Sequence, residues 1–189
     1  MDTIKVIVEK DPEGYVGYLT GIKAVVVGEG ATYAQALANV KSAVDFYQSN
    51  FGDNILKGVD DIEHTLKEVT GKSSYTMNFP TDVPRLRVRK TFELLGFKGA
   101  RTGTDHVLMV RDNADGSKTP LTIPNFHTIK GCTLRTICML LGIPRYEFSK
   151  LYGESEKMIG YLPNRPEGAV EDAPPERKRY SPRWQPRKP

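Results

Sequence analysis

The sequence predicts a mixed α+β fold of two small domains followed by a basic tail. Residues 4–47 have the pattern of three short apolar strands and one long amphipathic helix. Residues 82–142 have the pattern of a helix, a short strand, a hairpin and a second helix. Residues 161–189 hold seven of the thirteen prolines and almost no aliphatic residues, so this segment cannot bury enough surface to offset the entropy of ordering. We therefore expect domains over residues 1–70 and 82–152, a linker over 71–81, and a Pro-rich basic tail over 153–189.

The first three strands are predicted by short apolar runs separated by turns. Ile4, Val6 and Val8 alternate with charged residues, which is the period of a half-buried strand. Residues 11–14, Asp-Pro-Glu-Gly, form a hairpin turn, so residues 15–19 are the returning strand and 24–27 the third. The acidic residues beside these strands are expected to be solvated surface rather than metal ligands: Asp2, Glu9, Asp11, Glu13 and Glu29.

A long helix is expected to follow these strands. Thr32 and Gln35 can form a capping box at its start, and one helical stripe of the sequence is apolar. That stripe consists of Leu37, Val40, Val44 and Tyr47. Farther along the chain, Val59, Ile62, Leu66 and Val69 again have helical spacing, which predicts one short helix with His64 on its polar face. Residues 71–78 then have the composition of a linker.

The second predicted domain opens with a helix whose core-facing stripe is Val88, Phe92 and Leu95. Asp82 is expected to cap this helix and Gly96 to end it. A glycine-bearing turn at residues 101–105 then leads into an apolar strand over residues 106–110.

The remaining elements of this domain are a hairpin and a second helix. Residues 113–116, Asn-Ala-Asp-Gly, predict the hairpin turn, and residues 120–123 the returning strand. In the helix that follows, Thr133 is expected to be the cap and Gly142 to end it. This order of elements is the arrangement of a small double-stranded-RNA-binding-like fold.

Short motifs of the second domain resemble the HicA family of messenger-RNA-cleaving toxins. The matching residues are Leu94-Leu95-Gly96-Phe97, Asp105-His106, Ile123-Pro124-Asn125 and Thr133-Leu134-Arg135. The resemblance implies a double-stranded-RNA-binding-like αβββα fold with a single catalytic histidine, which is His106 if Thr104 stands at the family's glycine position. In the alternative register Gly103 is that glycine, Asp105 stands where the histidine is required, and the domain is inactive.

The first domain resembles the HicB antitoxin family. Gly30-Ala31-Thr32 followed by Ala36-Leu37 corresponds to that family's signature. This resemblance implies a partial ribonuclease-H-like βββα fold that is not itself a nuclease. A HicB-like domain followed by a HicA-like domain implies an antitoxin and its toxin fused in one chain.

The charge distribution differs between the two halves of the chain. Residues 1–80 contain seven lysines, no arginine and eleven acidic residues, a net charge of −4, whereas residues 81–189 carry +8. Such a division suggests that the basic half binds a polyanion and that the acidic half shields it.

The residues expected to act on RNA are one histidine and several cations. Metal-free cleavage of RNA needs a base for the 2′-hydroxyl proton, and imidazole titrates near neutral pH. We expect His106 to be that base, with no metal or cofactor; if the domain is a ribonuclease, His106 must be solvent-accessible. Lys98, Arg101 and Lys118 are expected to hold phosphate, and Arg135 to do so together with helix amides. In the tail, basic side chains are expected to neutralise phosphates while a ring stacks on bases. These tail residues are Arg177, Lys178, Arg179, Arg183 and Trp184.

The leading functional hypothesis is therefore a toxin–antitoxin fusion in which the HicB-like domain covers the RNA-binding face of a HicA-like ribonuclease, in the same chain or in a neighbouring copy of a homo-oligomer. The alternative is an inactive RNA-binding or assembly protein, anchored by its tail to RNA or to a larger ribonucleoprotein complex. A DNA-binding regulator is the weakest reading, because no helix-turn-helix pattern is visible. We expect a cytoplasmic protein with no membrane partner, because no apolar run is long enough to span a bilayer and Cys132 and Cys138 cannot pair within one helix.

Overall fold

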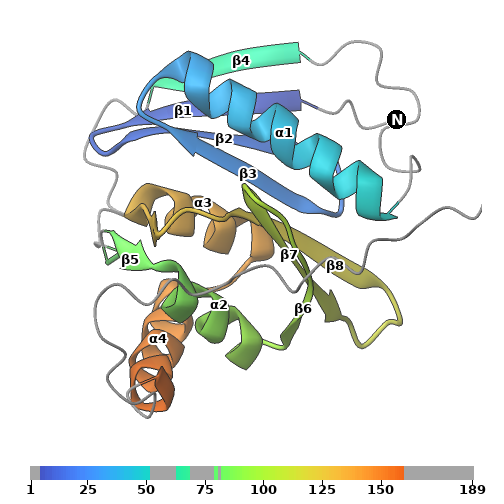
Figure 1. Cartoon of the computed structure of the whole chain (residues 1–189), viewed down its shortest axis with the longest axis vertical. Coiled ribbons are helices and arrows are strands. Elements are labelled where there is room, and N and C mark those ends of the chain that lie inside the picture. Colours follow the sequence, from blue (N-terminus) through green and yellow to red (C-terminus); the bar gives the residue numbers. More distant parts are fainter. Residues whose placement is uncertain (1–4, 52–62, 69–78, 81, 160–189) are drawn as a thin grey trace, which may run out of the picture.

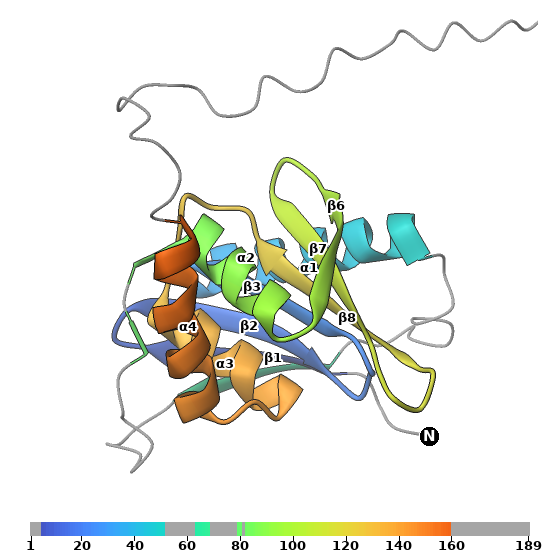
Figure 2. The same cartoon turned by 90° about the horizontal axis from the view of Figure 1, so that it is seen from below.

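The computed structural model describes residues 5–51, 63–68, 79–80 and 82–159, and within them it confirms a mixed α+β fold. One seven-stranded sheet, in the order β4-β1-β2-β3-β8-β7-β6, runs through both halves of the chain (Figure 1). Helix α1 lies on one face of this sheet, and α2 and α3 lie on the other (Figure 2). The predicted linker over 71–81 and the tail beyond residue 159 fall almost entirely outside the described residues.

The first half contains the three strands and the long helix that the sequence predicts. They are β1 (Lys5–Asp11), β2 (Gly14–Thr20), β3 (Val25–Gly30) and α1 (Tyr33–Phe51). The helix start resembles the predicted capping box: the Thr32 hydroxyl accepts a bond from the Gln35 amide, while the Gln35 side chain accepts one from the amide of Ala31, one residue earlier than expected. Gly28 permits α1 to pack directly on β3, because a Cβ there would lie 2.5 Å from the backbone nitrogen of Val40.

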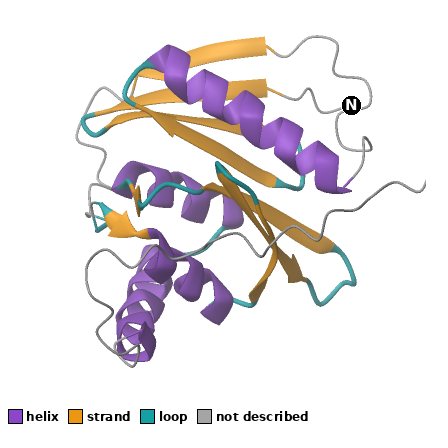
Figure 3. Cartoon of the chain, viewed as in Figure 1, coloured by secondary structure: helices purple, strands orange, loops and turns teal. Residues whose placement is uncertain are grey.

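The prediction of a short helix between the halves is wrong for the residues of that segment that the structure describes. Glu63–Glu68 form strand β4, which pairs in parallel with β1 (Figure 3). This pairing satisfies the backbone groups along the edge of β1, and that long-range gain outweighs the helical spacing of the apolar residues. The other residues of the predicted helix lie outside the described ranges.

The second half follows the predicted order of helix, strand, hairpin and helix, with three additional elements. Its predicted elements are α2 (Arg85–Leu94), β7 (His106–Asp112), β8 (Lys118–Pro124) and α3 (Gly131–Leu141). The remaining strand of the expected αβββα order is β6 (Phe97–Thr102), to which the sequence pattern assigned no residues and whose last two residues were expected in the turn over 101–105. The additions are β5 (Val83–Pro84), which pairs with β9 (Thr128–Ile129), and α4 (Arg145–Ile159). Gly96 and Gly142 follow α2 and α3 with positive φ angles, as predicted.

Two predicted caps are wrong. Asp82 is not the cap of α2, because β5 intervenes and Pro84 occupies the cap position without a side-chain bond. Thr133 lies inside α3, whose cap is Lys130, because the Thr133 hydroxyl instead bonds across the structure to Glu29.

Helix α4 continues through residues 153–159, which the sequence analysis assigned to the tail. Its contacts with α2 explain this extension. The Arg87 guanidinium lies 3.8 Å from the centroid of the Tyr152 ring, and the Thr91 hydroxyl bonds to that of Ser155 at 3.3 Å. These partners bury one side of α4 well past residue 152.

The two halves are joined by a short parallel pairing of β3 with β8. Val25 pairs with Leu121 and Val26 with Thr122. Both cores draw on both halves: Leu108 of β7 belongs to the cluster beneath α1, and Tyr18 belongs to the cluster beneath α2 and α3. The division into separately folding domains stays a prediction. Among the described residues, no helix has the length and apolar character required to span a membrane.

Candidate functional site

His106 and three of the predicted phosphate-holding residues share one face of the sheet. His106 is the first residue of β7, as predicted, and Leu108 and Asp112 point to the same face because strand side chains alternate. Arg101 lies opposite Leu108, and Lys118 lies opposite Asp112. Lys98, opposite Val110, also belongs to this face.

Helix α1 covers the His106 end of this face. The His106 side chain is only 4% exposed, its Nε2 lies 3.0 Å from the Ser42 hydroxyl, and the Phe46 ring lies 5.9 Å from the imidazole. Nδ1 is buried without a hydrogen-bond partner among the described residues. The solvent accessibility that a catalytic His106 requires is therefore contradicted by the arrangement that the structure shows, in which α1 covers the side chain. Burial lowers the pKa of His106, with Asp105 acting in the opposite direction, so the neutral imidazole is favoured.

The loop that leads into His106 is held by Asn125, at the end of the neighbouring strand. The Asn125 side-chain amide donates to the carbonyls of Gly103, at 2.8 Å, and Thr104, at 3.0 Å. Arg85 in turn donates to the Asn125 side-chain and backbone oxygens. Sequence reasoning matched Asn125 to a motif but could not pair it with Arg85, because nothing in the local pattern reveals a partner forty residues away.

Gly103 permits the close approach of α1 to this loop. A Cβ at Gly103 would lie 2.6 Å from Cε2 of Phe46, which is closer than van der Waals contact. The glycine in the turn before His106 therefore gives space to a ring of the covering helix.

The other end of the same face is an open groove of about 430 Å³, lined by the end of α1 and by β6–β8. Lys98 and Lys118 both lie here, with side chains 80% and 66% exposed, and each is close to Asp112, at 3.3 Å and 3.9 Å. Arg101 lines the groove and is exposed, and within the described part of the chain it forms no ion pair. The structure thus brings three predicted RNA-binding cations together.

Arg135 does not join this face. It lies on α3, on the opposite side of the sheet, where its guanidinium forms an ion pair with Asp11 at 2.7 Å. The five predicted RNA-binding residues of the tail fall outside the described residues.

Acidic residues of the first half contact the start of α3, so the expectation that they are solvated surface is wrong for those the structure describes. Glu29 is 4% exposed and accepts bonds from the Thr133 hydroxyl, at 2.5 Å, and the Lys130 amide, at 3.3 Å. Glu13 accepts from the Cys132 amide at 3.1 Å. The free amides and positive partial charge of a helix start account for this attraction. Glu9 is also buried and accepts a bond from the Tyr18 hydroxyl.

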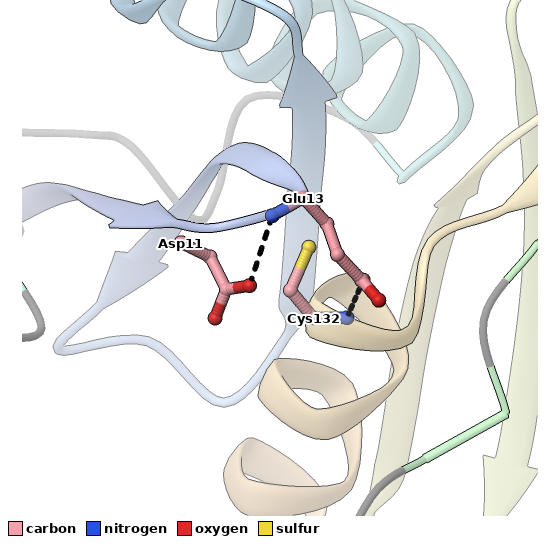
Figure 4. A group of neighbouring side chains, drawn as sticks. All are labelled: Asp11, Glu13 and Cys132. Atoms are coloured by element: carbon pink, nitrogen blue, oxygen red, sulfur yellow. Dashed lines mark hydrogen bonds between the residues drawn. The ribbon is translucent and has the colours of Figure 1, made fainter. Parts of the chain in front are cut away.

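Asp11, Glu13 and Cys132 form a compact group whose possible ligand atoms lie within 4.8 Å of one another (Figure 4). Their existing contacts explain this proximity. Asp11 accepts from the Glu13 amide and pairs with Arg135, while Glu13 holds the start of α3. Burial, reinforced by the neighbouring carboxylates, raises the pKa of the Cys132 thiol to about 12, so the sulfur keeps its proton. The group is part of the contact between the two halves.

The buried Glu29 predicts a pH-dependent stability. Desolvation raises the pKa of Glu29 above its ordinary value of 4.5, although the bonds from Thr133 and Lys130 oppose this. A carboxyl with a raised folded-state pKa contributes stability below its unfolded pKa, and that contribution is lost as the pH rises through the folded pKa. In urea titrations at several pH values, the unfolding free energy of the wild type should therefore fall relative to Glu29→Gln as the pH rises above 4.5. A difference that does not change with pH would contradict this assignment.

Comparisons with known proteins do not place the chain in a family. No family model, curated protein or solved structure matches it. The likeness to HicB and HicA therefore remains a hypothesis based on the quoted motifs.

Proposed function

We propose that the chain is a toxin–antitoxin-type fusion whose C-terminal half binds RNA and cleaves it by metal-free histidine chemistry, while its N-terminal half covers the cleavage site. The observation that carries this proposal is the position of α1 over His106, on the sheet face that also presents Lys98, Arg101 and Lys118. Two residues of α1 cover His106: Ser42 makes a polar contact with the imidazole, and Phe46 makes a ring contact with it.

In the proposed reaction, neutral His106 accepts the proton of a ribose 2′-hydroxyl. The 2′-oxygen forms a bond to the adjacent phosphorus, and the bond from phosphorus to the 5′-oxygen breaks. The leaving oxygen takes a proton from water or from the imidazolium, which leaves a 2′,3′-cyclic phosphate and a 5′-hydroxyl end. The cations on the same face stabilise the charge on the phosphate oxygens during this step. Burial lowers the pKa of His106 in the covered state; once α1 lifts, an ordinary imidazole still titrates near neutral pH and supplies the base form that the first step needs.

The proposal is tested by loosening the cover with a single substitution. Gly103→Val should force the Phe46 ring, and with it α1, away from the loop, since even a Cβ would approach that ring to 2.6 Å. Overpacking costs about 1–3 kcal/mol, which corresponds to a rise of roughly 5- to 150-fold in the uncovered population. Cleavage of a labelled single-stranded RNA should rise within that range. Gly153→Val, on α4 where a Cβ meets nothing within 4 Å, is the matched control.

A second function, RNA binding without cleavage, is favoured by a different observation. The sheet is continuous through the β3–β8 pairing, and Leu108 is buried in the core beneath α1. In this reading His106 is a packing residue that bonds to Ser42, and the cover never opens. A folded Gly103→Val chain that binds RNA but leaves it intact would select this function and refute the nuclease.

A further inference from the structure

The groove beside His106 has features that are not needed for α1 to cover this histidine. It combines three cations from β6 and β8 with two residues from the last turn of α1, Asn50 and Phe51. Both halves of the chain therefore contribute to it. The groove is open in the same arrangement in which α1 buries His106.

We propose that this groove binds single-stranded RNA while His106 is covered, so that the closed chain binds RNA without cutting it. The inference rests on the proposed RNA binding and extends it to named residues of the N-terminal half. Among the described residues that line the groove, Asp112 is the one acidic side chain, against Lys98, Arg101 and Lys118, so this described lining carries a net positive charge. Because the Asp112 pairs are exposed, a phosphate can replace the carboxylate at little cost.

The end of α1 suits a nucleotide better than a bare phosphate. Phe51 is 39% exposed and stacks at 5.0 Å on Tyr47, which fixes its ring as a surface on which a base can stack. The partial negative charge at a helix C-terminus attracts the amino groups of bases and disfavours phosphate. Cations on the strands and an aromatic ring on the helix thus match the two parts of a nucleotide.

The direction of the groove connects it to the histidine. Arg101 lies opposite Leu108, which is two residues from His106 and therefore about 7 Å from it along the strand. A strand of RNA held at Arg101 is thereby placed next to His106 and would be positioned for cleavage once α1 lifts.

Binding is tested on the ¹⁵N-labelled full chain with a single-stranded RNA of roughly six nucleotides, within the usual range of single-strand sites. Amide shifts should appear at residues 50–51, 98–101 and 118. Arg101→Gln should lower the log–log salt slope of binding by roughly 0.7, the contribution of one phosphate contact on a single strand. Lys150→Gln, at an exposed lysine on α4, is the matched control. A second pair compares Phe51→Leu, expected to weaken binding, with Tyr146→Leu, at a ring that is 75% exposed on α4.

Amide shifts confined to residues 160–189, or equal salt slopes for Arg101→Gln and Lys150→Gln, would overturn the groove as a binding site. Equal affinity for a duplex of the same length would overturn its preference for single strands. These outcomes are separate from the cleavage test. A chain that binds in the groove yet never cuts RNA would refute only the nuclease, and a cutting chain with an inert groove would refute only the present inference.

Discussion

Replacing His106 with alanine in the Gly103→Val chain is expected to lower the RNA-cleavage rate by about 10²- to 10⁴-fold, the usual contribution of a general acid–base group. Lys98, Arg101 and Lys118 remain in this variant, so RNA affinity should persist while the chemical step is lost. Single-turnover rates and binding isotherms on the same RNA separate the two effects. In the Gly103→Val chain that still has His106, the RNA-cleavage rate should also fall as the pH drops, because the imidazole becomes protonated.

The control for this substitution is His127→Ala. His127 is an exposed histidine three residues beyond the end of β8, so its loss should leave the rate nearly unchanged. Equal losses at His106 and His127 would show that the effect is not specific to His106 and would contradict a single catalytic histidine. An unchanged rate in the His106→Ala chain would reject the histidine mechanism altogether.

Leu108→Ala is expected to lower the free energy of unfolding by about 2–5 kcal/mol, because truncating a buried leucine loses transfer energy and leaves a cavity. Leu108 is 1% exposed and contributes from the second half to the core beneath α1. Its loss should therefore weaken the first half as well as its own strand. Urea titrations followed by circular dichroism, with amide exchange read separately for β1–β3 and β6–β8, measure both effects.

The matched control is Leu86→Ala on α2, where the leucine is 42% exposed and the expected cost is within about 0.5 kcal/mol. If the exchange rates of β1–β3 do not respond to Leu108→Ala, the two halves are energetically separate despite the common sheet. That result would support the two-domain division predicted from the sequence.

Local patterns predicted most of the elements because their causes are local. The alternation of Val6 and Val8, the stripe that includes Val40 and Val44, and the glycines after α2 and α3 all act within a few residues. Strand β4 was missed because its partner β1 lies nearly sixty residues earlier. Helix α4 was not predicted, and the domain boundary was placed inside it at residue 152, because the contacts of Tyr152 and Ser155 with α2 are long-range.

The sequence predicted which residue types form the candidate site, but it did not predict which residues of the other half would contact them. The position of His106 at the head of a strand followed from a turn and an apolar run. The three cations of the groove were named because Lys98 and Arg101 precede His106 closely in the chain and Lys118 lies across the hairpin. Burial by Ser42 and Phe46 and the role of Glu29 at α3 depend on how the two halves meet. No pattern within either half carries that information.

The pairing of β3 with β8 restricts how the chain can open. If the halves separated fully, each would present an unpaired strand edge, and such edges pair with other copies and promote aggregation. The parallel register spans only two residue pairs, yet it keeps both edges occupied. A reversible exposure of His106 therefore requires α1 to lift from an intact sheet. An isolated second half should accordingly be prone to self-association, with β8 offering its free edge to the next molecule.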